Sequence, residues 1–347
     1  VAVGRVRGMF DPLLEAIPNL GVLMVLLVGS IRLEHGAMRP GDLVQVAFLF
    51  TLLAWPVRAL GWVLAELPRS VVGWQRVRKV LDATGSLPYG TGTLDGVGAV
   101  SLDVCDVRFG YREPILREVS FHVPAGRTVA VVGPTGSGKS TLTSLLVRLI
   151  DPTGGRVLLD GLDVRDIRKG GVAAVAALVP QQTFLFDDTV RGNITLGADV
   201  PDEEVWAALR TAQADGFVAA LPHGLDTRLG ERGTTLSGGQ RQRLSLARAL
   251  VRNPRLLVMD DATSAVDPEV EARILAALRG SAGSGSATVV VVAYRKATIA
   301  LADEVVYLRD GRVADQGTHA ELLARNPGYA DLVNAYEQEQ SGEVTVP

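Results

Sequence analysis

Two long runs without a charged residue stand near the start of the chain. One covers 16 residues, 16–31, and the other covers 15 residues, 43–57. A short spacer of turn-like composition, 32–42, separates them. Uninterrupted apolar runs of this length predict helices that are embedded in a membrane or buried in a protein core. The short spacer predicts that the two helices are antiparallel, and the second is expected to continue to about Leu81, past Pro56 and Pro68, where it can kink.

Each run is a little shorter than the ~20 residues of a typical membrane span, so two buried helices of a soluble domain are the alternative. Tryptophans that follow the second run favour the bilayer, because interfacial aromatic residues gather at membrane surfaces. Basic residues lie outside the hairpin and weakly favour cytoplasmic termini. Two spans cannot form a substrate pathway, so we expect further spans upstream. The tryptophans are Trp55, Trp62 and Trp74, and the basic residues are Arg5, Arg7, Arg69, Arg76, Arg78 and Lys79.

The pattern changes after residue 81. Residues 82–98 are rich in Gly and Thr and predict a flexible linker. From 99 to 337 short β-rich runs alternate with helical spacing, which predicts an α/β domain, and 338–347 reads as a flexible tail. Strands are expected at 100–108, 119–123, 127–132, 157–162, 177–179, 256–259 and 288–292, the first two as edge strands of an antiparallel piece. Helices are expected at 140–150, 202–212, 239–252, 270–278 and 319–324.

Composition narrows the functional classes. The chain has 347 residues, enough for two domains, and its net charge of −3 does not suggest a nucleic-acid partner. Its single cysteine, Cys105, cannot form an internal disulfide, which fits a reducing compartment. One Cys and four scattered His offer no zinc-ligand spacing.

Residues 133–141, GPTGSGKST, match the P-loop pattern of Gly, four residues and then Gly-Lys-Ser. The glycines allow successive backbone N–H groups to turn around an anion, Lys139 adds a point charge, and the Ser140 hydroxyl can ligate Mg²⁺. A strand before the loop and a helix after it place phosphates at a helix N-terminus. The alternative, a chance Gly-rich loop, does not explain that context. The predicted nucleotide-binding residues here are Gly133, Pro134, Thr135, Gly136, Ser137, Gly138, Lys139, Ser140 and Thr141.

Two further motifs follow the P-loop. The apolar run 256–259 ends in Asp260 and Asp261, so a strand tip can aim a carboxylate at Mg²⁺ beside the P-loop. Residues 236–240, LSGGQ, can begin a helix, with Ser237 as its N-cap and two glycines that let an anion approach. One chain should need one phosphate cradle for one nucleotide. A second cradle therefore implies a nucleotide shared between two protomers, unless 236–240 is an ordinary capped helix.

With these motifs together, the segment 100–337 resembles the nucleotide-binding domain of an ABC transporter. LSGGQ is similar to the family signature almost letter for letter, 179–186 resembles the Q-loop region of exporters, and 264–267 resembles the D-loop. The front of the chain, 36–61, resembles the last membrane helix of an exporter half-subunit. The resemblance implies an α/β P-loop ATPase fold preceded by a helical transmembrane segment, 1–81, with ATP and Mg²⁺ as cofactors.

The resemblance also implies roles for individual residues. Tyr111 is expected to stack on adenine, and Glu231 is expected to contact the membrane domain. Gln181 is expected to contact Mg²⁺ and the attacking water, so the implied metal ligands are Ser140, Gln181 and Asp260. The residues implied at the signature are Ser237, Gly238, Gly239 and Gln240.

Two positions depart from the family pattern. Asp261 stands where the family has a Glu as general base, and Asp is one methylene shorter. Tyr294 stands where the family has a His, and a phenol cannot copy the donor–acceptor role of imidazole. With Gln181, these are the predicted catalytic positions. Both departures beside an intact P-loop and signature predict the degenerate-site half of a heterodimeric exporter; a slow homodimer and a decayed gene are the alternatives.

The leading hypothesis is therefore an ATP-driven exporter subunit in the plasma membrane, with its ATPase domain in the cytoplasm. Its expected partners are a second exporter half, the lipid bilayer and an unidentified substrate, with no nucleic acid. A soluble ABC ATPase of DNA repair or translation is a second hypothesis, which the apolar hairpin and the net charge disfavour. A regulatory or structural ABC protein that binds ATP with little turnover is a third.

Overall fold

The computed structural model describes residues 2–83, 87–230, 233–280 and 287–341, with the side chains of 2–15, 280 and 338–341 left aside. It divides into two compact units, 1–86 and 87–347, which are described separately. The first unit holds two antiparallel helices, α1 (Ala2–Glu34) and α2 (Pro40–Leu81). Helix α2 is continuous through Pro56 and Pro68 and ends at Leu81, as expected from the sequence.

The helices of the first unit have the length and composition of membrane spans. Segments Ala16–Glu34 and Pro40–Leu81 have mean hydropathies of 1.8 and 1.7 in their most apolar windows. No residue of α2 is buried, and the side chains of Trp55 and Trp62 are more than two-thirds exposed. Most large apolar side chains of α2 are exposed, unlike those of a core helix in a soluble domain. The unit therefore fits a lipid environment better than water.

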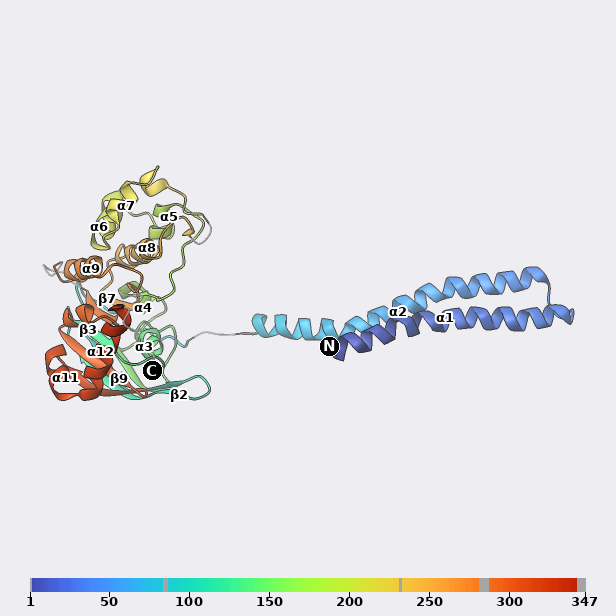
Figure 1. Ribbon diagram of the computed structural model, residues 1–347, viewed down its shortest axis with the longest axis horizontal. Helices are drawn as coiled ribbons and strands as arrows, with labels where there is room; N and C mark the ends of the chain where they lie inside the picture. Colours follow the sequence, from blue (N-terminus) through green and yellow to red (C-terminus); the bar gives the residue numbers. More distant parts are fainter. Residues whose placement is uncertain (1, 84–86, 231–232, 281–286, 342–347) are drawn as a thin grey trace. The chain divides into compact units, whose positions relative to one another are not determined.

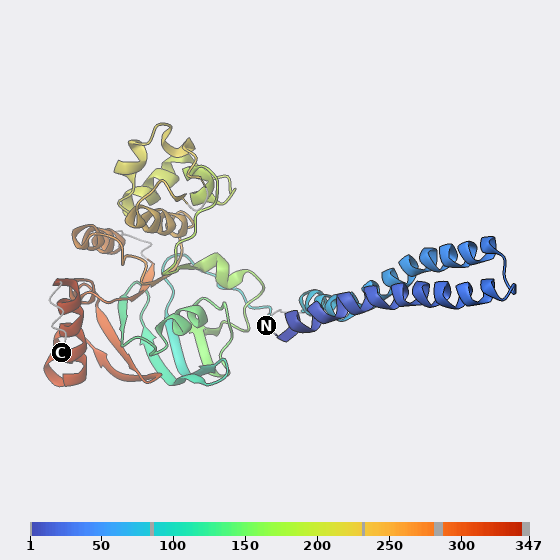
Figure 2. The same ribbon diagram turned by 45° about the vertical axis from the view of Figure 1, so that its right-hand side comes forward.

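The second unit is an α/β domain with two sheets (Figures 1 and 2). Among the residues that the structure describes, its strands are β1 (Leu102–Gly110), β2 (Pro114–Val123), β3 (Thr128–Val132), β4 (Gly154–Leu159), β5 (Leu162–Asp163), β6 (Ala176–Val179), β7 (Leu256–Asp260), β8 (Thr288–Val292), β9 (Glu304–Arg309) and β10 (Arg312–Gly317).

Helices complete the unit, and four of them, α5 to α8, gather in a helical lobe beside the sheets (Figure 2). The described helices are α3 (Lys139–Leu146), α4 (Gly171–Val175), α5 (Val190–Thr195), α6 (Asp202–Thr211), α7 (Asp215–Ala219), the short 3₁₀ helix η1 (Gly224–Asp226), α8 (Gly238–Leu250), α9 (Pro268–Gly280), α10 (Lys296–Ala300), α11 (His319–Arg325) and α12 (Pro327–Ser341).

The larger sheet has the order β10-β9-β3-β8-β7-β6, and its strands are parallel except for β10. The smaller sheet has the order β2-β1-β4-β5 and is antiparallel. The sequence predicted the antiparallel pairing of β1 and β2, but it was wrong to place β1 at an edge, because β1 also pairs with β4. Strands β9 and β10 and helix α12 were not predicted.

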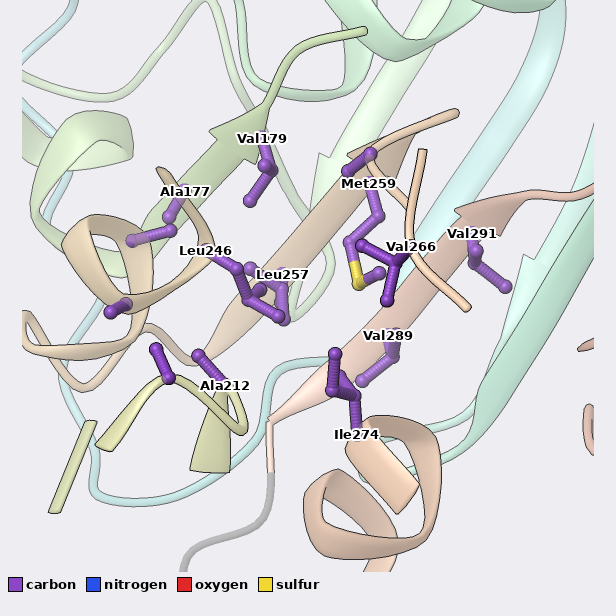
Figure 3. Close-up of a cluster of buried hydrophobic side chains, with 14 of the residues drawn as sticks. Ala177, Val179, Ala212, Leu246, Leu257, Met259, Val266, Ile274, Val289 and Val291 are labelled. Carbon is purple, nitrogen blue, oxygen red and sulfur yellow. The ribbon is translucent and has the colours of Figure 1, made fainter. Parts of the chain in front are cut away.

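The central strands are buried on both faces, and successive residues enter two different cores. In β3, Val129 and Val131 pack between the two sheets, whereas Ala130 and Val132 pack on the opposite face against the helices. This explains why the predicted strands are uninterrupted apolar runs without alternation. Figure 3 shows the helix-facing core, to which the strands contribute Ala177, Val179, Leu257, Met259, Val289 and Val291, α8 contributes Leu246 and α9 contributes Ile274.

Part of the segment expected to be a flexible linker is bonded to the α/β unit. The N–H groups of Gly90 and Gly92 donate to the carbonyl oxygens of Arg165 and Asp166, at 3.1 and 2.8 Å. Arg148, just beyond α3, donates to the carbonyl oxygen of Pro88 and places its guanidinium 4.7 Å from the ring centre of Tyr89. Arg148 has a φ of 53°, which ends the helix earlier than the expected residue 150.

Candidate functional site

The P-loop connects the end of β3 to the start of α3, in the strand–turn–helix context that the sequence predicted. Gly136 and Gly138 have φ values of 83° and 100°, a left-handed backbone that favours glycine. A Cβ on Gly133 would lie 2.1 Å from the carbonyl oxygen of Leu308, so no larger residue fits there. The glycines of the motif are thus required by backbone geometry and by close packing on β9.

Lys139 is the first residue of α3 and is almost fully buried, with 4% of its surface exposed. Its Nζ donates to the carbonyl oxygens of Gly133 at 2.5 Å and of Pro134 at 2.8 Å. The ring of Tyr294 lies beside it, with its centre 4.8 Å from Nζ. Burial lowers the pKa of Lys139 to about 8, although the charges of Asp260 and Asp261 act in the opposite direction.

Strand β7 ends at Asp260, which is 8% exposed and lies beside α3. Thr143 Oγ1 donates to Asp260 Oδ2 at 3.4 Å, and Ser140 is a second hydrogen-bond partner. Burial raises the pKa of Asp260, while these bonds and the charge of Lys139 lower it. The predicted carboxylate and the predicted hydroxyl ligand are therefore neighbours.

Asp261 follows with a φ of 51°, a left-handed conformation that does not continue the extended strand. Its Oδ2 accepts a hydrogen bond from Gln181 Nε2 at 2.9 Å, which joins the expected Q-loop residue to the expected base position. Burial raises the pKa of Asp261, and the bond from Gln181 lowers it. Burial and the two carboxylates raise the pKa of Tyr294 to about 12, so its phenol stays protonated at physiological pH.

A cleft of about 680 Å³ collects most of the predicted site residues. Tyr111 is outside the described lining of this cleft; it is 71% exposed and packs edge-on against Phe109, with ring centres 5.1 Å apart. Glu231 lies outside the residues that the structure describes. The predicted residues that line the cleft are Thr135, Gly136, Gly138, Lys139, Ser140, Thr141, Gln181, Asp261 and Tyr294.

The signature motif, 236–240, forms the start of α8 and is separate from the described lining of the P-loop cleft. Ser237 caps this helix, accepting from the Gln240 N–H at 3.2 Å, while the Gln240 side chain accepts from the Ser237 N–H at 2.8 Å. A Cβ on Gly239 would lie 2.6 Å from the carbonyl oxygen of Ala265, so α8 begins directly against the 264–267 segment. The signature residues are not in the described lining of the cleft beside the P-loop.

Further residues of the site carry no signal that the sequence analysis used. Arg295 Nη1 donates to Glu271 Oε2 at 2.6 Å and to the carbonyl oxygen of Val266 at 2.7 Å. Thr263 Oγ1 donates to the other Glu271 oxygen at 2.6 Å. These buried contacts join the end of β8 to α9 and to the segment after β7. Arg295 and Glu271 are separated by 24 residues, and no local pattern reveals their pairing.

The residues present fit a phosphate chain with a hard divalent cation. Hydroxyl, carboxylate and amide oxygens are the ligands that Mg²⁺ prefers, and Mg²⁺ is usually held by one or two carboxylates together with substrate phosphates. Within the described residues, no group of three or more His, Cys, Asp or Glu side chains could hold a metal. Ser137 Oγ is buried without a hydrogen-bond partner in the described part of the chain, which fits a ligand in the loop.

Comparisons with known proteins agree with a nucleotide-binding site. Residues 116–264 match the family of ABC transporters. The chain is 41% identical over 335 residues to a multidrug efflux ATP-binding/permease protein of Mycobacterium tuberculosis, covering 96% of this chain and 28% of that protein. It is 39% identical over 327 residues to the ATP-dependent lipid A-core flippase of Vibrio cholerae, covering 93% of this chain and 56% of that protein.

A solved structure of a bacterial Atm1-family ABC exporter with ATP bound is also similar, with a TM-score of 0.68 and 36% identity. The match covers 96% of this chain and 59% of that one. The chain thus spans between about a quarter and three-fifths of the length of these relatives.

Proposed function

This chain belongs to the ABC transporter family, and we propose that it is an ATP-binding subunit of a membrane exporter whose own ATP site hydrolyses slowly. The observation that carries the proposal is a shared cleft in which the P-loop meets Gln181, Asp261 and Tyr294. The apolar helices of the first unit, which have the length and composition of membrane spans, support its membrane part.

In this proposal Lys139 and the P-loop N–H groups bind the phosphates, and Tyr111 stacks on the adenine. Ser140, Asp260 and Gln181 would hold Mg²⁺, and the bound cation would neutralise charge on the phosphates. The contact between Asp260 and Thr143, together with that to Ser140, orients the carboxylate toward the start of α3. The buried position of Lys139 strengthens its attraction to an anion, because screening by water is small there.

The chemistry at Asp261 and Tyr294 supports slow hydrolysis. A general base must reach the proton of the attacking water, and the carboxylate of Asp261 is one methylene shorter than that of Glu and already accepts from Gln181. Tyr294 contacts Lys139 through its ring face and keeps its proton, so it cannot act as imidazole does. General-base catalysis contributes typically 10²–10⁴-fold, and we assign a deficit on the order of this size to the site built on Lys139.

The partner in this proposal is a second exporter half. The signature helix α8 is separate from the cleft beside this chain's P-loop, and its capped N-terminus can accept an anion. We propose that Ser237 completes the ATP site on the partner's P-loop, where most turnover occurs. The plasma membrane location, the cytoplasmic ATPase domain and the heterodimer belong to the same proposal. The alternative is a regulatory ABC protein that binds ATP with little turnover.

Steady-state ATPase rates of the transporter assembled with its cognate half test the asymmetry. Asp261→Ala should leave most of the activity, because this carboxylate serves the slow site. Ser237→Arg should remove most of it, because a bulky cation blocks the γ-phosphate position of the partner's site. Thr318→Arg is the matched control, since Thr318 and Glu321 form the same kind of capping box on α11.

Three outcomes distinguish the proposed slow ATP site from its alternatives. A larger loss with Asp261→Ala than with Ser237→Arg would make Asp261 a working base and end the slow-site proposal. An equal loss of ATPase activity in Thr318→Arg and Ser237→Arg would mean that Ser237 acts only as a helix cap. Little ATPase activity in the assembled wild-type pair would favour the regulatory alternative.

A further inference from the structure

The C-terminal helix contacts the P-loop through one tyrosine. Tyr336 lies in α12, and its hydroxyl donates to the carbonyl oxygen of Gly133 at 2.7 Å across 203 residues of sequence. Its ring packs edge-on against Tyr294, with ring centres 5.4 Å apart. Helix α12 therefore contacts both the first residue of the P-loop and the residue that lies beside Lys139.

The Gly133 carbonyl accepts from two side chains. Lys139 Nζ donates to it at 2.5 Å, in addition to the bond from Tyr336. A carbonyl oxygen has two lone pairs, so both donors can be accommodated. Lys139 has three donors, and two of them are directed at the carbonyls of Gly133 and Pro134. A phosphate oxygen must therefore compete with these carbonyls for the ammonium group.

We infer that Tyr336 is a positioning residue of the nucleotide site, acting through the Gly133 carbonyl and Lys139. Its hydroxyl holds the carbonyl in place and shares the oxygen's negative charge with the lysine. Without the hydroxyl, the carbonyl is left to Lys139 alone, which holds the ammonium more tightly on the loop and makes it less available to phosphate. The loop also loses a fixed point, so more ordering is required when a ligand binds.

The same contacts give Tyr294 a second role. Its ring contacts both Lys139 and Tyr336, so Tyr294, which stands at the position of the family's His, also couples the packing of α12 to the lysine. The inference rests on the proposed function, because it concerns the affinity of the P-loop for a nucleotide. It adds α12, which follows β10 in the sequence, to the elements that form the nucleotide site.

The test is Tyr336→Phe in the full chain, because phenylalanine keeps the ring and removes only the hydroxyl. A net hydrogen bond changes an equilibrium by about two- to tenfold, so calorimetry should show MgATP binding weakened by about this factor. Inorganic tripolyphosphate, which has no base or sugar, should lose the same factor, because the effect acts through the P-loop. The thermal unfolding midpoint should stay close to that of the wild type.

Tyr307→Phe is the matched control. Tyr307 also donates through its hydroxyl to a backbone carbonyl, that of Gly328 in α12, at 3.3 Å, but this contact does not involve the P-loop. It should leave both affinities unchanged. Wild-type affinity in Tyr336→Phe, or the same loss in both variants, would overturn the inference. Lys139→Ala separates the two proposals: retained MgATP binding in that variant would overturn the proposed function itself.

Discussion

At the scale of single residues, burial gives Lys139 chemistry that its sequence motif does not reveal. The motif correctly places a lysine after the glycines, but only the structure shows that its ammonium is nearly enclosed and lies between two carbonyls and an aromatic ring. The contacts of Tyr336 and Arg295 could not be predicted either, since each joins residues far apart in the chain and leaves no periodic pattern. The assigned roles of the site residues remain predictions.

The lowered pKa of Lys139 predicts a pH-dependent affinity. The free protein holds Lys139 with a pKa of about 8, below the ordinary value of 10.5, while bound phosphates favour the charged form. Nucleotide binding should therefore take up a proton above pH 8, and affinity for MgATP should be roughly tenfold lower at pH 9 than at pH 7. Calorimetry in two buffers of different ionisation enthalpy measures this proton uptake.

Lys139→Arg is the control for this prediction, because arginine keeps its charge throughout this range. Its affinity, even if weaker overall, should not change between pH 7 and pH 9. Proton uptake of equal size in the arginine variant would assign the titration to another group.

At the scale of elements, the sequence revealed most strands that are buried on both faces but missed β9, which contributes side chains to both cores. Strands β3, β7 and β8 read as apolar runs because helices or a second sheet cover each face. Strand β10 has no buried residue and lies at the edge of its sheet, so no hydrophobic pattern reveals it. Helix α9 was predicted from its spacing, but its role in joining the site segments was not.

Glu271 in α9 should be essential for joining these elements. It is 5% exposed and accepts from both Arg295 and Thr263, so Glu271→Ala leaves a mostly buried guanidinium without its carboxylate. Removal of one partner of a buried ion pair typically costs about 3–5 kcal/mol. For a domain of this size we expect the unfolding midpoint in detergent to fall by roughly 6–20 °C.

Glu269→Ala provides the comparison, because Glu269 is an exposed acidic residue in the first turn of the same helix. Its effect should stay within about 0.5 kcal/mol. Similar losses in both variants would mean that helix propensity or general charge, and not the buried pair, governs the stability of α9.

At the scale of the whole molecule, the two units require different solvents. The α/β unit buries its apolar residues in two cores, whereas α1 and α2 leave large apolar side chains exposed from Ile17 to Leu81. We therefore predict that the chain stays with the membrane pellet after carbonate extraction. A variant that begins at Leu87 should appear in the soluble fraction, and release of the full chain with it would refute a membrane-embedded hairpin.

The hydrogen bond between Arg148 and Pro88 also limits how far the α/β unit can move from the end of α2. Helix α2 ends at Leu81 and the bonded segment begins at Pro88, so six residues, 82–87, connect them. The seven Cα–Cα steps from Leu81 to Pro88 span at most roughly 25 Å when the chain is fully extended. Throughout any conformational change, Pro88 of the α/β unit therefore stays within this distance of the C-terminal end of α2.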